Sequence, residues 1–150
     1  MAELITGATG FLLAVLWFDL MFDVQVLRHR RAAVVPEPVL DSISANYRRV
    51  TTTASPMGRL VALTMLVLLV ALATQAGRDD VARWVSAVSL SAAALAIGLA
   101  AVRVFGTAKR LGARVDPADV RSALARSIFR DHLVCLMAMV ALLAVQLAGA

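Results

Sequence analysis

Cysteine and lysine are almost missing from the chain. Cys135 is the only cysteine and Lys109 the only lysine among 150 residues. A chain with one thiol can form neither an intrachain disulfide nor a CxxC metal or redox site. A lone thiol inside an apolar segment usually packs as a small hydrophobe, and we expect this role for Cys135.

Charged residues are also scarce. They make up 17% of the chain, whereas apolar residues make up 61%; in a soluble globular domain about a quarter of the residues are charged. The net charge of +5 comes almost wholly from arginine. No aromatic-plus-basic pattern typical of base stacking accompanies it, so we expect no nucleic acid partner.

Motifs for common chemistry are absent from the sequence. It contains no glycine-rich phosphate loop, no nucleophile elbow and no zinc-protease motif. Its histidines, aspartates and single cysteine have no spacing typical of metal ligands. The sequence therefore predicts no cofactor and no metal site, and its catalytic residues stay unknown.

Long apolar runs are abundant. A helix of about 20 apolar residues crosses the roughly 30 Å hydrocarbon layer of a membrane. Four such runs cover residues 5–27, 57–76, 81–102 and 133–148. Glu3 rather than a basic residue precedes the first run, and Asp19 and Asp23 lie inside it, so we interpret it as a retained helix rather than a signal peptide. The sequence predicts an all-α integral membrane four-helix bundle, a single domain over residues 1–150.

Basic residues predict the orientation of this bundle. The short turn between spans two and three holds only Arg78 and Arg83, offset by two aspartates, and no Lys or Arg precedes the first span. By the positive-inside rule both long loops are cytoplasmic and both termini lie outside, in a multi-pass protein of the bacterial cytoplasmic (inner) membrane. The basic residues of the two long loops are Arg28, Arg30, Arg31, Arg48, Arg49 and Arg59, and Arg103, Lys109, Arg110, Arg114, Arg121, Arg126 and Arg130.

Each long loop is predicted to contain a short amphipathic helix. In the first loop a helix over residues 40–50 follows a Pro-Glu-Pro break and places Ile43 and Tyr47 on one side. In the second loop Asp116 caps a helix that Pro117 begins, and its apolar side runs on into span four. The two halves of the chain thus share a plan, which suggests two parallel hairpins of common origin.

Asp19 and Asp23 are the most unusual residues. They lie four apart, on one face of the first span. Because an acidic side chain in a membrane helix costs about 2.5 to 3.5 kcal/mol, it is a functional candidate by default. One hypothesis is a proton, cation or substrate site facing the bundle interior. The other is that the carboxylates pair with Arg103, Arg130 or His132 and hold the helices in register.

Histidines and glycines offer weaker candidates. His29 ends the first span and His132 begins the fourth, so a haem between them would need the two to face each other across the bundle; histidines at a membrane interface are more often ordinary polar ends. Gly7 and Gly10, with Ala14, and Gly98 in the third span form small-residue faces. We expect these faces to permit close helix packing.

The second half of the chain also follows a known pattern. A Thr107-Ala108-Lys109-Arg110-Leu111 stretch ends span three, Asp116-Pro117 leads the loop, His132 begins span four, and Asn46-Tyr47-Arg48-Arg49 precedes span two. From Val104 to Leu147 the chain resembles the anthrone-oxygenase-like family of small four-helix membrane proteins. That family has Asn where this chain has Ala108, and Arg where it has Cys135. The resemblance therefore implies the fold more than an oxygenase activity.

Three functions are compatible with these observations. The compact bundle without motifs favours a non-enzymatic protein that binds a lipophilic ligand or a partner membrane protein within the bundle. The resemblance implies instead a membrane enzyme for a hydrophobic aromatic or quinone-like substrate, with His132 as acid–base group and Asp19 or Asp23 assisting. The third is a proton- or cation-coupled transporter using the two aspartates, which needs a homo-oligomer because four spans alone enclose no path.

Overall fold

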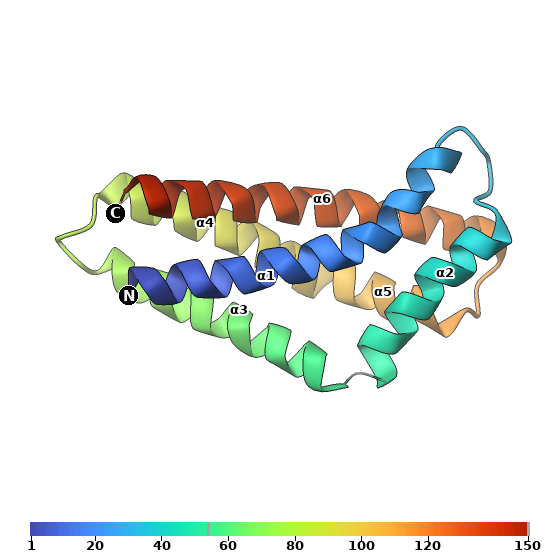
Figure 1. Cartoon of the computed structure of the whole chain (residues 1–150), viewed down its shortest axis with the longest axis horizontal. Helices are drawn as coiled ribbons and strands as arrows, with labels where there is room; N and C mark the ends of the chain where they lie inside the picture. Colours follow the sequence, from blue (N-terminus) through green and yellow to red (C-terminus); the bar gives the residue numbers. More distant parts are fainter. Residues whose placement is uncertain (54, 150) are drawn as a thin grey trace.

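The computed structural model describes residues 1–53 and 55–149, and every regular element in that part of the chain is helical. Four helices are long and apolar enough to cross a membrane, as predicted. Their order and connections are drawn in Figure 1. The elements are α1 Ala2–Asp23, the 3-10 helix η1 Val24–His29, α2 Glu37–Arg48, the π-helical η2 Arg49–Thr53, α3 Ser55–Ala76, α4 Arg83–Leu99, the π-helical η3 Ala100–Val104, α5 Phe105–Ala113 and α6 Ala118–Ala148.

The four long helices form an antiparallel bundle. Each packs on its neighbours in the sequence, and α6 closes the ring by packing on α1. Both chain termini lie at one end of the bundle, called here the terminal end, and α2 and α5 lie at the other, the α2–α5 end (Figure 1). Alanines and leucines fill the space between the helices, among them Ala8, Ala71, Leu72, Ala93 and Leu142. Small side chains let membrane helices approach closely. Close van der Waals packing then holds the helices together, because lipid gives no hydrophobic driving force for their association.

The outward faces of the helices are apolar and aromatic. Phe18 is 65% exposed and Met137 63% exposed, which suits a surface in contact with lipid. Trp84 and Phe105 are also exposed. They lie 21 residues apart on the continuous helix formed by α4, η3 and α5, a separation of about 31 Å. Aromatic rings at this spacing match the two boundaries of a hydrocarbon layer.

A second core lies at the α2–α5 end. It joins η1, α2, α5 and the first three turns of α6, an assembly called here the cap, and its centre includes Leu40, Ile43, Leu111 and Ile128. The predicted amphipathic helix is present, with Ile43 and Tyr47 buried as expected. It begins at Glu37 rather than at residue 40, because a proline in the first turn is compatible with a helix.

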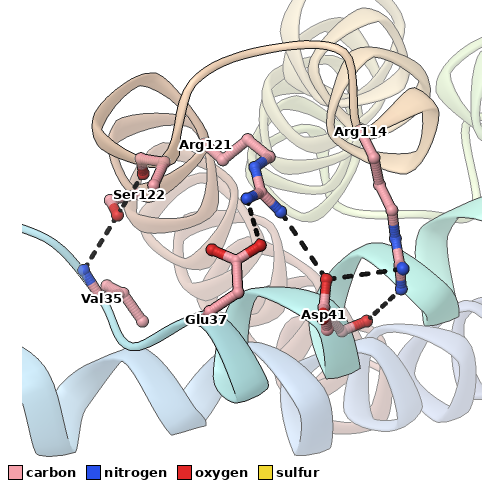
Figure 2. Close-up of polar contacts among 7 residues, drawn as sticks. Val35, Glu37, Asp41, Arg114, Arg121 and Ser122 are labelled. Atoms are coloured by element: carbon pink, nitrogen blue, oxygen red, sulfur yellow. Dashed lines mark hydrogen bonds and ion pairs between the residues drawn. The ribbon is translucent and has the colours of Figure 1, made fainter.

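Ion pairs between arginines and α2 hold the cap together (Figure 2). Arg121 is 8% exposed and pairs with Glu37, and it lies 3.7 Å from Asp41. Arg114 binds the same Asp41 through its carboxylate and its backbone carbonyl. Ser122 accepts a 2.9 Å hydrogen bond from the backbone N–H of Val35. These contacts fasten α2 to the start of α6.

The prediction that the Asp116 side chain caps the N-terminus of α6 is wrong. Helix α6 begins at Ala118, Pro117 has non-helical backbone angles, and no side chain caps the helix. Asp116 instead accepts two 2.8 Å hydrogen bonds from Arg110, a bidentate pair that is stronger than a neutral cap bond. The Arg110 guanidinium also holds the pKa of Asp116 below its usual value. The other expectation for this region is confirmed, since the amphipathic helix and span four are one helix.

The helix that contains the third predicted span continues beyond residue 102. The helix passes through the π-helical turn η3 and continues as α5 to Ala113. Its end is set by Arg114, which adopts a left-handed conformation with φ 58°. Ala108 and Leu111 on α5 are buried in the cap. The residues beyond 102 therefore stay helical because their apolar face has a core to pack against.

The small-residue faces are not where helices meet. A methyl group added at Gly7, Gly10 or Gly98 would meet no described atom of a neighbouring helix within 4 Å, so the expected close packing is wrong for them. Gly112 is the opposite case. A methyl there would lie 2.8 Å from the backbone nitrogen of Arg48. α5 and the end of α2 thus touch backbone to backbone.

Candidate functional site

Three polar side chains meet in the interior where the bundle joins the cap. Asp23 comes from the end of α1, Tyr47 from the end of α2 and His132 from the middle of α6. Tyr47 Oη donates to Asp23 at 2.7 Å from Oδ1 and 2.8 Å from Oδ2. His132 Nδ1 lies 2.7 Å from Asp23 Oδ2. All three side chains are buried, and we call them the triad.

Each member of the triad reaches the site by ordinary helix geometry. Tyr47 continues the buried stripe of α2 that begins with Leu40 and Ile43. His132 follows Ile128 and precedes Cys135 and Met139 on the buried side of α6. Asp23 lies where α1 tightens into the 3-10 turn. The polar groups therefore occupy core positions, and they need each other because burial removes them from bulk solvent.

The hydrogen bonds indicate which nitrogen of His132 carries its proton. The two oxygens of Asp23 are acceptors, so Nδ1 donates to Oδ2 and the Tyr47 hydroxyl donates to Oδ1. The other ring nitrogen, Nε2, makes no hydrogen bond to a described residue. A carboxylate that orients a histidine through Nδ1 leaves Nε2 able to accept a proton.

Asp19 is near the triad but differs from Asp23. It is only partly buried, and its one side-chain hydrogen bond with a described residue is a 3.3 Å contact from Asn46 on α2. The two aspartates do share one side of α1, as their spacing predicts. Asp23 is buried in the core, and Asp19 lies at the edge of the core.

Arg103 and Arg130 do not join the triad. Arg103 pairs with Asp131 at 3.2 Å, on the α4 side of α6. Arg130 is exposed and makes no ion pair with a described residue. Of the basic partners expected for the aspartates, only His132 reaches one of them. Asp131 was not predicted as a partner, although it lies between Arg130 and His132, which were.

The structure does not gather His29 with His132. His29 is partly buried at the end of η1, where its carbonyl accepts a hydrogen bond from Arg126. His132 Nδ1 is engaged with Asp23. Within residues 1–53 and 55–149, no group of three or more His, Cys, Asp or Glu side chains could hold a metal ion.

Burial of Tyr47 gives a test of the triad. Burial, and next the charges of Asp23 and Asp19, raise the pKa of Tyr47 far above its ordinary value near 10. A raised pKa favours the neutral phenol in the folded state, so this contribution to stability is complete below about pH 10 and is lost as the pH rises further.

Tyr47 is the only tyrosine in the chain, so tyrosinate absorbance reports on this residue alone. We expect no tyrosinate signal from the folded protein at about pH 11, while the unfolded chain ionises near pH 10. Circular dichroism recorded alongside should show helix loss together with ionisation. Ionisation near pH 10 with the helices intact would contradict the buried triad.

A second polar cluster lies near the terminal end. Gln75 and Gln146 exchange side-chain hydrogen bonds of 3.1 and 2.9 Å, and Gln146 also donates to Ser89 at 2.9 Å. The cluster is buried and joins α3, α4 and α6. This cluster was not predicted from the sequence. Its signal was a single glutamine in each of two otherwise apolar spans, since such amides must find partners in lipid.

Two shallow grooves open on the outer surface of the bundle. One, of about 460 Å³, lies between α4 and α6 and is lined by small and apolar side chains such as Ser91, Ala92, Leu95 and Ala138. The other, of about 330 Å³, lies between α1 and α3 beside Gly7 and Phe11. Neither groove includes a residue of the triad.

Comparison with models of protein families, with curated proteins and with solved structures gives no significant match to this chain.

Proposed function

We propose that the protein is a non-enzymatic, multi-pass component of the bacterial cytoplasmic membrane, with the α2–α5 end in the cytoplasm and both termini outside. The concentration of arginine at the α2–α5 end supports this orientation. The cap supports it as well, because its ion pairs and second core resemble those of a protein domain in water.

The proposed activity is binding of a lipophilic ligand, or of a helix from a partner membrane protein, in the α4–α6 groove. The observation that carries this proposal is the contrast between interior and surface. Inside the bundle the polar groups bind one another, in the triad and in the glutamine cluster. The groove between α4 and α6 is open to the outside and apolar, with a volume of about 460 Å³.

Photocrosslinking from the groove tests this proposal. A photoreactive amino acid at Ser91, in the groove, should give one discrete adduct when cells are irradiated. The matched control is Leu66, which is exposed at a similar depth on α3 and lines neither groove. The mass of the adduct separates a small ligand from a partner protein. Identical adducts from both positions would contradict a site in the groove.

Acid–base catalysis at His132 is a second candidate. It is favoured by the unpaired Nε2 of a histidine that a buried carboxylate orients. It also agrees with the resemblance to the anthrone-oxygenase-like family, whose substrates would be hydrophobic aromatic or quinone-like molecules. The absence of the triad from both grooves places it second. A His132→Gln variant that folds normally but loses turnover of such a substrate would reverse the order.

A further inference from the structure

Apart from Arg126, which donates hydrogen bonds to the backbone carbonyls of His29 and Ala32, the basic residues of the α2–α5 end fall into two groups. Those of the first group make ion pairs within the chain: Arg103, Arg110, Arg114 and Arg121 bind Asp131, Asp116, Asp41 and Glu37. These contacts use most of the carboxylates at this end. The second group makes no ion pair or side-chain hydrogen bond with a described residue: Arg28, Arg30, Arg31, Arg48, Arg49, Arg59, Lys109 and Arg130. The second group is therefore free to meet an external anion.

Four of the unpaired cations come from segments that converge. Arg48 and Arg49 lie where α2 passes into η2, and η2 contacts both α5 and α3. The backbone of Arg48 touches α5 at Gly112. Lys109 precedes Gly112 by three residues, so it lies one turn along the same side of α5. Arg59 lies in the first turns of α3, about 6 Å along the helix from its start.

Exposed apolar side chains adjoin these cations. Phe105 is four residues before Lys109, on the same side of α5, and it is 60% exposed. Leu60 follows Arg59 and is also exposed. Cations at the boundary of the membrane with apolar groups beside them suit a molecule that is anionic at one end and apolar at the other. A free phosphate would use only the cations.

We propose that Arg48, Arg49, Arg59 and Lys109 bind the headgroup of an anionic phospholipid, with Phe105 and Leu60 against its acyl chains. The other unpaired arginines differ in origin. Arg28, Arg30 and Arg31 come from one short stretch at the end of η1, which Figure 1 shows on the opposite side of the cap from the end of α2. They supply general attraction to an anionic surface, whereas the four residues supply a site. This inference does not depend on the α4–α6 groove.

Lipid binding to the full-length protein in detergent micelles tests the site. Phosphatidylglycerol or phosphatidylcholine is added, and native mass spectrometry and the melting temperature report binding. We expect the wild type to retain phosphatidylglycerol preferentially and to be stabilised by it. The triple variant R48Q/R49Q/K109Q should bind it more weakly, by about fivefold for each charge removed. Inorganic phosphate at the same concentration should not stabilise the wild type.

The matched control is R28Q/R30Q/R31Q, which removes the same charge from the opposite side. It should lose clearly less affinity for phosphatidylglycerol than R48Q/R49Q/K109Q does, and R48K/R49K should keep the affinity of the wild type. Equal losses in both triple variants would reduce the effect to diffuse electrostatics and overturn the site. So would a wild type without preference for phosphatidylglycerol. If the first triple variant does not fold, R59Q/K109Q removes two of the four charges without altering the α2–α5 contact, and it should weaken binding in the same way.

Discussion

Replacing Asp23 by alanine is expected to lower the free energy of unfolding by about 3 kcal/mol or more. The change leaves the Tyr47 hydroxyl and His132 Nδ1 buried without their acceptor, and each orphaned polar group costs about 1 to 3 kcal/mol. It also removes the side-chain hydrogen bonds that link α1 to α2 and to α6 at this level. We therefore expect a large fall in the amount of folded protein recovered from membranes and in its melting temperature in detergent.

Asp19→Ala is the matched control for this experiment. It removes the same side chain from the same face of α1, one turn earlier, but breaks only a 3.3 Å hydrogen bond from Asn46 at a partly exposed position. We expect it to cost less than about 1 kcal/mol. Equal effects of the two substitutions would show that the triad does not hold the helices together. A stable Asp23→Ala protein would move the balance toward a chemical role for this carboxylate.

Gly112→Ala is expected to destabilise the cap by about 1 to 3 kcal/mol. The added methyl would lie 2.8 Å from the backbone nitrogen of Arg48 and 3.1 Å from its Cα. These are backbone atoms, which cannot rotate away as a side chain can, so α2 and α5 must move apart. That movement loosens the packing of Tyr47 and Leu111 between them.

Gly106→Ala is the control for this substitution. It lies two turns earlier on the same helix, and its added methyl would meet no described atom within 4 Å. Alanine is the better helix former by roughly 0.5 to 1 kcal/mol, so this variant should be neutral or slightly stabilised. Melting temperatures of the two variants in the same detergent give the comparison. If Gly112→Ala were as stable as Gly106→Ala, the close approach of α2 and α5 would be wrong.

The four long helices could be predicted because they depend on local information alone. In lipid every backbone group must be satisfied within its own segment, so length and hydropathy identify a spanning helix. The ends of those helices were harder to predict from the sequence. Whether residues beyond 102 stay helical depends on Leu111 and Ala108 finding a core built from α2 and α6. The residues of α5 alone do not show that α2 and α6 provide this core.

The partner of Asp23 could not be chosen from the sequence for a geometric reason. Consecutive residues on a helix point about 100° apart, so Arg130, Asp131 and His132 face three directions. The rotation of α6 turns His132 toward α1, Asp131 toward Arg103 and Arg130 outward. Judged by side-chain chemistry alone, Arg130 was as good a partner for the Asp23 carboxylate as His132. Tyr47 was placed on an apolar face without a role, although a buried tyrosine hydroxyl usually needs a hydrogen-bond partner.

Helix α6 is one uninterrupted rod of 31 residues, about 46 Å long. Arg121 near its beginning forms an ion pair with Glu37 on α2, and His132 lies at its middle. Farther along, Ala138 lines the α4–α6 groove and Gln146 belongs to the glutamine cluster. Because no break interrupts α6, a rotation of this helix would move all of these side chains together. Ala138 in the groove and Arg121 in the cap therefore belong to one continuous helix.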